Sequence, residues 1–293
     1  MKIAYVRYKI NEVYIKGVEN DEDSELLSFL EQKGLLIKSV TWSDNKINWK
    51  DFQIIILKSP WDYHENISSF YKWLDKIKSL GIKLINPIDI IKWNSNKRYL
   101  SDISNSGLST VKTIYLERNS QLKTDYSLFK QLNSNKIVIK PCISASAKNT
   151  FVVEISNFTK LAKTINLLLL KEEYLAQPFI EEIINDGEWS FVFFNSKFSH
   201  SALKIPKKGD FRVQHSHGGT IKYPKPKLEI IEQVKKFVER FAQNTLYVRV
   251  DGIIKEKLFY LMEIEMIEPY LFLNNKEERM EMYYNALREL MLK

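Results

Sequence analysis

The chain has 293 residues, of which 44% are hydrophobic and 27% are charged, and its formal net charge is +8. No apolar run approaches the roughly 20 residues of a membrane-spanning helix, the N-terminal residues lack the apolar core and cleavage site of a signal peptide, and the single cysteine, Cys142, excludes an intrachain disulfide. We therefore expect a cytoplasmic globular protein of two or three subdomains. The lysines are scattered along the chain, so the net charge alone does not indicate a nucleic-acid partner.

Residues 1–90 alternate short β-rich runs with helical patterns. Helices are expected at 24–33, with Ser24 as the N-cap, and at 66–80. This alternation predicts a small parallel sheet with helices on its faces, whose ligands bind beyond the carboxyl ends of the strands. Its strands are predicted at 3–6, 37–42, 54–58 and 83–85. The loop after the third strand is a candidate substrate loop, with the candidate contact residues Ser59, Trp61, Asp62 and Tyr63.

Two further units are expected, at 91–180 and 181–293. The first begins with a predicted helix at 93–104 and continues with alternating strands and helices. Its later elements are strands at 111–116, 136–140, 151–154 and 174–180, and helices at 127–132 and 157–170. The last unit is rich in strands. It is predicted to contain a hairpin of 188–195 and 197–204, an amphipathic helix at 227–243, a second hairpin within 248–267 and a closing helix at 276–293.

Three carboxylates interrupt the apolar stretch between 248 and 267. Glu263 and Glu265 are two residues apart, so on a strand they share one face. The polar turn at 255–257 makes the stretch a hairpin and brings Asp251 opposite, or nearly opposite, Glu263. One such acid is more typical of a solvated strand face. Three together require compensation by positive charge, and a hard cation such as Mg2+, shared with substrate phosphates, would provide it.

Upstream segments carry groups suited to phosphate binding. The strand at 136–140 ends in Lys140 and opens into a loop of small residues, whose backbone N–H groups can approach phosphate oxygens. This loop is not a P-loop, because the required glycines are absent. A second loop, 209–220, contains Arg212, which can act as a phosphate clamp. Each segment alone is more typical of an exposed surface or a linker.

The order of these segments resembles the order found in the ATP-grasp superfamily. The resemblance is greatest to the branch around bacterial glutathione synthetase and the O-ureido-serine cyclo-ligase of D-cycloserine biosynthesis. The resemblance covers nearly the whole chain and is strongest from 93 to 273. It rests on Ser-Pro-Trp-Asp-Tyr at 59–63, Trp-Asn-Ser-Asn-Lys-Arg-Tyr-Leu at 93–100, Lys-Pro-Cys-Ile-Ser-Ala-Ser-Ala at 140–147, Gly-Asp-Phe-Arg-Val-Gln at 209–214 and Glu-Ile-Glu-Met-Ile-Glu-Pro-Tyr-Leu-Phe-Leu at 263–273. It implies an α/β (α+β) ATP-grasp fold with an N-terminal parallel α/β domain, a central lid subdomain and a C-terminal antiparallel-sheet subdomain.

The resemblance also implies a site between the middle and last units. The catalytic residues would be Lys97 and Lys140 on the ATP phosphates and Arg212 on the transferred phosphoryl group. One or two Mg2+ ions, or Mn2+ in their place, would be held by Asp251, Glu263 and Glu265, although relatives often carry Asn at the last position. The nucleotide would also contact Ser144, Ser146, Gln177, Pro178, Phe179, Ile180 and a ribose-binding acid among Glu181, Glu182 and Glu188. Further substrate contacts would come from His200, Lys204, His215, Gly218 and Gly219.

The implied function is an ATP- and Mg-dependent carboxylate–amine ligase that forms an acylphosphate and releases ADP and phosphate. Its partners would be ATP, a carboxylate-bearing small molecule or peptide and an amine nucleophile, with neither nucleic acid nor membrane. An intramolecular cyclo-ligase and a peptide-modifying ligase remain open as variants. A nucleotide-binding regulator that has lost catalysis is the alternative from another class. The sequence names neither substrate nor oligomeric state, and a homodimer is compatible with it.

Overall fold

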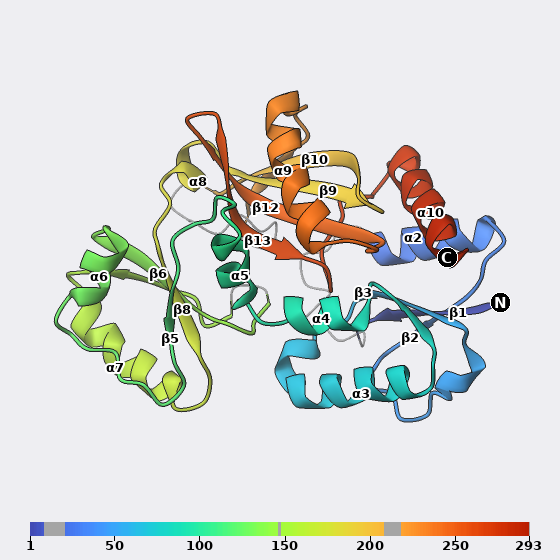
Figure 1. Cartoon of the computed structure of the whole chain (residues 1–293), viewed down its shortest axis with the longest axis horizontal. Helices are drawn as coiled ribbons and strands as arrows, with labels where there is room; N and C mark the ends of the chain where they lie inside the picture. The colour runs from blue at the N-terminus through green and yellow to red at the C-terminus, as the bar shows by residue number, and fades with distance from the viewer. Residues whose placement is uncertain (9–20, 146–147, 208–217, 293) are drawn as a thin grey trace.

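The computed structural model describes residues 1–8, 21–145, 148–207 and 218–292. These residues form one parallel sheet near the N-terminus and two antiparallel sheets in the middle and last parts of the chain (Figure 1). The predicted α/β class, with an N-terminal parallel sheet and a C-terminal antiparallel sheet, is confirmed.

The N-terminal sheet has the strand order β2-β1-β3-β4. Its strands are β1 (Lys2–Arg7), β2 (Leu36–Val40), β3 (Ile54–Ser59) and β4 (Lys83–Ile85). Short 3-10 helices lie at Trp49–Asp51 and Tyr63–Asn66. Helix α3 (Ile67–Ser79) covers one face with Phe70, Trp73, Leu74 and Ile77, a spacing that places these side chains on one stripe of the helix. The helix begins where the Asn66 side chain accepts a hydrogen bond from the backbone N–H of Ser69.

Helix α2 (Glu22–Gln32) starts before its predicted first residue. Ser24 is therefore not the N-cap but lies in the first turn, where its backbone N–H donates to the carbonyl of Asp21 at 3.0 Å. Two ion pairs explain the earlier start. Arg7 binds Asp21 at 2.8 Å and Lys58 binds Glu22 at 2.9 Å, so the first turn is fixed against the ends of β1 and β3.

The single helix predicted at 93–104 is wrong. The chain forms α4 (Ile88–Asn94) and α5 (Tyr99–Asn105) instead. The break between them holds Lys97, whose backbone N–H donates to the carbonyl of Cys142 at 2.8 Å rather than to a carbonyl of its own helix. The break thereby ties Lys97 to the loop that follows strand β6.

The middle sheet has the order β5-β8-β6-β7 and a hydrophobic core of its own. It consists of β5 (Ile114–Leu116), β6 (Lys136–Pro141), β7 (Phe151–Glu154) and β8 (Tyr174–Pro178), with α6 (Ser127–Leu132) and α7 (Phe158–Leu169). The predicted strands at 111–116 and 174–180 are therefore shorter than expected.

The C-terminal sheet has the order β11-β10-β9-β12-β13. Its elements are β9 (Glu188–Phe194), β10 (Lys197–Ile205), β11 (Thr220–Lys222), β12 (Tyr247–Lys255) and β13 (Leu258–Glu265), with α8 (Glu182–Asn185), α9 (Leu228–Phe241) and α10 (Glu277–Met291). Both predicted hairpins are confirmed. Their turns, Asn195-Ser196 and Glu256-Lys257, have positive φ at both residues, as tight two-residue turns between twisted strands require.

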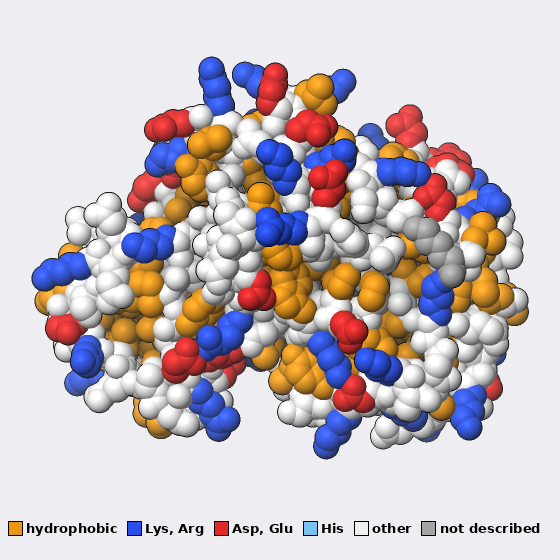
Figure 2. Space-filling view, viewed as in Figure 1, with side chains coloured by type: hydrophobic (Ala, Val, Ile, Leu, Met, Phe, Trp, Pro, Cys, Tyr) orange, Lys and Arg blue, Asp and Glu red, His pale blue; other side chains and the backbone are white. Residues whose placement is uncertain are grey.

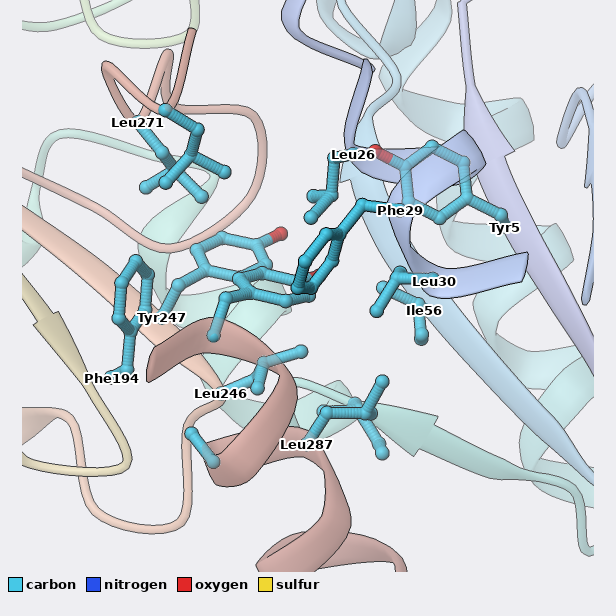
Figure 3. Close-up of a cluster of buried hydrophobic side chains, with 14 of the residues drawn as sticks. Tyr5, Leu26, Phe29, Leu30, Ile56, Phe194, Leu246, Tyr247, Leu271 and Leu287 are labelled. Atoms are coloured by element: carbon cyan, nitrogen blue, oxygen red, sulfur yellow. The ribbon is translucent and has the colours of Figure 1, made fainter. Parts of the chain in front are cut away.

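The N-terminal sheet and the C-terminal part of the chain share one hydrophobic core. In Figure 3, Tyr5, Phe29 and Ile56 from the N-terminal part lie close to Tyr247 and Leu287 from the C-terminal part. The middle sheet contributes nothing to this cluster, whose residues fall within 3–85 and 192–290. Residues of the middle unit instead enter a second core with the last unit, to which they contribute Tyr99, Leu100, Ile103, Cys142 and Leu175.

The face of the molecule shown in Figure 2 carries acidic and basic side chains mixed with apolar ones. Among the described residues, no helix is long and apolar enough to cross a membrane.

Candidate active site

The predicted opposition of the carboxylates is confirmed. Asp251 is paired with Glu263 across β12 and β13, and Arg249 is paired with Glu265. The Asp251 side chain is only 3% exposed, whereas Glu263 and Glu265 are 28% and 22% exposed. The hairpin thus presents two partly accessible carboxylates on β13 and one buried carboxylate on β12.

Strand alternation places these acids on one face of the C-terminal sheet. Along β12, Val248 and Val250 enter the core formed with α9, while Arg249 and Asp251 occupy the opposite face. Tyr247, which has the same parity as Arg249, packs in the core shared with the N-terminal sheet. The charged face therefore lies next to the contact between the first and last units.

Side chains of the protein supply positive charge to this face. Lys204 binds Glu188 at 2.7 Å and Asp251 at 3.0 Å, and Lys97 binds Glu263 at 3.0 Å. Arg249 binds both Asp251, at 2.9 Å, and Glu265. Burial alone would raise the pKa of Asp251, but Arg249 and Lys204 outweigh burial and lower this pKa to about 2.

Lys140 lies beside this network and makes no ion pair or side-chain hydrogen bond with the described residues. Its charged neighbours are Glu263, Lys97 and Glu188, which lie on other segments. Burial lowers the pKa of the Lys140 ammonium, because its charged form has lost water without gaining a close partner. A phosphate oxygen would supply that partner, so the position of Lys140 fits the predicted role.

The expected metal site is only partly formed. Among the described residues, no group of three or more His, Cys, Asp or Glu side chains could hold a metal ion. Asp251 is enclosed by Arg249 and Lys204, so its oxygens already have partners. Glu263 and Glu265 are more accessible, and two carboxylates suffice when phosphates and water provide the remaining Mg2+ ligands. The donor set fits a phosphate-bound Mg2+ on Glu263 and Glu265.

The loop after β6 faces the same region. The carbonyl of Ser144 accepts a hydrogen bond from the Lys97 ammonium at 2.9 Å. Lys148 of this loop and Lys97 are charged neighbours of His64, which belongs to the N-terminal loop after β3. The small-residue loop therefore lies where the middle and first units approach each other.

The predicted adenine-edge segment runs from the end of β8 into the connection to α8. Gln177 is buried and donates a side-chain hydrogen bond to Thr113 at 3.0 Å, and the backbone N–H of Phe179 donates to Lys136 at 2.9 Å. Pro178 and Ile180 flank Phe179 in this segment. The segment is thus anchored to the middle sheet.

The candidate ribose acids differ in their partners. Glu182 binds Lys255 at 2.7 Å, and Glu188 binds Lys204 at the same distance. Glu181 is exposed and has no such partner among the described residues. Of the three, Glu181 is the acid whose carboxylate is available to a ligand.

The N-terminal candidate residues divide into two groups. Ser59 binds Asp23, Asp62 accepts a hydrogen bond from Trp42 at 2.8 Å, and Tyr63 is buried against Phe70, so these three support the N-terminal unit itself. Trp61 instead reaches the C-terminal part. Its indole N–H donates to the carbonyl of Glu268 at 3.1 Å.

Among the described residues of the remaining substrate set, Lys204 joins the charged face, and His200, Gly218 and Gly219 do not. His200 bonds through its ring nitrogens to the Leu271 carbonyl and the Ser199 hydroxyl, both at 2.8 Å, and burial lowers its pKa to about 3. Gly218 and Gly219 precede β11, where Gly218 approaches Lys207. Lys204 is the member of this set that the structure brings to the carboxylates. Ser146, Arg212 and His215 lie outside the described residues.

Two residues of the face were not predicted. Arg249 lies two positions before Asp251, so the strand period that groups Glu263 with Glu265 also groups Arg249 with Asp251. Glu268 lies beyond β13, where no strand period applies. Burial and the neighbouring Glu265 raise the pKa of Glu268 to about 8, and burial raises that of Glu265 to about 7. Burial therefore disfavours the charged form of both acids at this end of the face.

Comparisons with known proteins agree with this geometry. A crystal structure of D-cycloserine synthetase DcsG matches with a TM-score of 0.83 and 20% identity over 100% of both chains. D-alanine–D-alanine ligase from Bacillus anthracis matches with a TM-score of 0.72 and 16% identity over 100% of this chain and 99% of that one. These matches give the chain the fold of the ATP-grasp ligases, as the sequence predicted.

The N-terminal unit is similar to one particular domain family. Residues 3–86 match the model of the N-terminal domain of D-cycloserine synthetase DcsG. The cycloserine biosynthesis protein DcsG of Streptomyces lavendulae is 23% identical over 182 residues, which span 61% of this chain and 60% of that protein. The chain thus has the fold of the ATP-grasp ligases, and its N-terminal unit is similar to that of DcsG.

Proposed function

We propose that this protein is an ATP- and Mg-dependent ligase that joins a carboxylate to a nitrogen nucleophile. The observation that carries the proposal is Lys140, a partly buried lysine beside Glu263 with no ion pair among the described residues. A nucleotide phosphate at this position would neutralise Lys140 and share a cation with the carboxylates of β13. The proposed units are 1–90 on the substrate side, 91–180 as the lid and 181–293 with the metal-binding strand.

Each of these residues has a proposed role in nucleotide binding. Lys97 and Lys140 bind the phosphates. The backbone of Gln177 to Ile180 binds the adenine edge, and Glu181 binds the ribose hydroxyls. Glu263 and Glu265 hold Mg2+, while Arg249 and Lys204 keep Asp251 charged and oriented. Arg212, outside the described residues, is proposed to contact the transferred phosphoryl group. ATP, when bound, supplies the phosphoryl group that turns a carboxylate into an acylphosphate with a good leaving group. Closure of the middle unit would exclude water from that intermediate.

An intramolecular cyclo-ligase is the variant that the match of residues 3–86 favours. The matched DcsG protein is named for D-cycloserine synthesis, and its N-terminal domain resembles the unit that carries the candidate substrate loop here. We therefore place O-ureido-serine, in both enantiomers, first among the compounds to test.

The proposal is tested by ADP release and by thermal stability. ATP with Mg2+ should raise the melting temperature, because a ligand that binds only the folded state stabilises it. ADP release should depend on a carboxylic acid, screened alone for cyclisation and together with amines for ligation. The absence of a thermal shift at millimolar ATP and Mg2+ would contradict nucleotide binding. A shift without ADP release from any acid would favour a regulator that has lost catalysis.

A further inference from the structure

Glu268 is an acid without a side-chain partner at the edge of the charged face. It follows β13, and its carboxylate forms no hydrogen bond or ion pair within the described residues. Its charged neighbours are Glu265 and Glu263, together with Lys97 and Arg249. A carboxylate that is partly removed from water beside two other acids carries a free-energy penalty, which a ligand with N–H groups would relieve.

The backbone around Glu268 is fixed from both sides. The carboxylate of Glu22, only 3% exposed, accepts hydrogen bonds from the backbone N–H groups of Leu271 and Leu273, each at 2.9 Å. Arg249 donates to the carbonyl of Tyr270 at 2.9 Å. Helix α2 and strand β12 thus hold the same short loop, so the Glu268 side chain extends from a preorganised backbone.

An aromatic side chain of the N-terminal unit contacts the backbone of Glu268. The Trp61 indole N–H donates to the Glu268 carbonyl at 3.1 Å, and Trp61 stacks on Tyr8 with ring centroids 4.4 Å apart. Burial raises the pKa of the Tyr63 hydroxyl, and Glu268 is one of its charged neighbours. Glu268 therefore lies where the candidate substrate loop meets the charged face.

This setting suits a nitrogen group better than a metal ion. A carboxylate without a side-chain partner among the described residues is a strong acceptor for an amine or ammonium group. Glu268 does not complete a cation site with Glu263 and Glu265, because the described residues contain no group of three acids that could hold a metal ion. We propose that Glu268 accepts a hydrogen bond from the amino group of an amino-acid substrate and so positions it beside the phosphate-binding lysines. This inference rests on the proposed ligase function and names one end of its substrate.

The test uses full-length protein and pairs of probes that differ only in the amino group. The pairs are D-alanine with D-lactate, L-alanine with L-lactate, D-serine with D-glycerate and L-serine with L-glycerate, each titrated by thermal shift in the presence of ATP and Mg2+. Wild-type protein should bind at least one amine probe more tightly than its hydroxy match. Glu268→Gln should weaken that probe by about 10- to 100-fold, the range of a lost charged hydrogen bond. Glu229→Gln, a substitution at an exposed position on α9, should leave the affinity for that probe unaltered.

The ATP and Mg2+ shift serves as an internal control. If Glu268→Gln keeps the thermal shift with ATP and Mg2+, the variant is folded. Glu268→Asp, which keeps the acid on a shorter side chain, should also bind the same amine probe more weakly. An unaltered amine preference in Glu268→Gln, or no preference in the wild type, would overturn the assignment. A lost nucleotide shift in a folded Glu268→Gln would also overturn it, because Glu268 would then belong to the metal site. Failure of the proposed function would appear separately, as an absence of ADP release by the wild type.

Discussion

Lys140 offers a prediction in which stability and binding change in opposite directions. In Lys140→Met the side chain keeps a similar length but loses its charge. Because the ammonium is partly buried without an ion pair among the described residues, its removal should stabilise the ligand-free protein by up to about 1 kcal/mol. The same change removes a charged hydrogen bond to phosphate, worth about 1.5–3 kcal/mol, so ATP should bind about 10- to 150-fold more weakly.

Lys97→Met provides the matched comparison. Lys97 binds Glu263 at 3.0 Å and the Ser144 carbonyl at 2.9 Å, so its removal leaves an acid and a carbonyl without this partner. The ligand-free protein should lose about 1–3 kcal/mol of stability. This is less than for a fully buried pair, since the Glu263 side chain is 28% exposed. ATP should again bind more weakly.

Urea unfolding measures the free energies of unfolding, and calorimetric titration with ATP and Mg2+ measures the affinities. The stability gained in Lys140→Met should also shrink as the pH rises towards 10.5, the ordinary lysine pKa, because the lowered pKa makes the folded wild type lose this charge first. A destabilised Lys140→Met protein, or one with unchanged ATP affinity, would refute the view of Lys140 as an unpaired cation kept for phosphate.

Two further substitutions test the metal and packing assignments. The double variant Glu263→Gln with Glu265→Gln should fold but lose Mg-dependent ADP release, and turnover at the wild-type rate would exclude these acids as metal ligands. Cys142 is fully buried beside the small-residue loop, and burial raises its pKa to about 12, so it remains a neutral packing residue. Cys142→Ala should therefore retain activity with a loss of about 1 kcal/mol in unfolding free energy, and a folded but inactive Cys142→Ala protein would contradict this role.

Local periodicity determined much of the fold. The apolar stripe of α9 and the polar turn at Glu256-Lys257 depend on neighbours close in sequence, so the helix and the hairpin could be read directly. The same hairpin geometry brought Asp251 opposite Glu263, as predicted. Helix breaks that depend on partners distant in sequence could not be predicted. Lys97 interrupts a helical pattern because its N–H binds Cys142, a residue 45 positions further along the chain.

The site shows the same division. Residue types and their order in the chain predicted the acids of β13, Lys97 and Lys140 as candidate site residues, because strand period and segment order can be read without coordinates. Only the tertiary structure showed that Arg249 and Lys204 already neutralise Asp251, and that His200 bonds to the Leu271 carbonyl instead of the charged face. It also placed Glu268 against Trp61, more than two hundred residues earlier in the sequence. Charge compensation depends on distances between side chains from different segments, and those distances are decided by packing rather than by spacing along the chain.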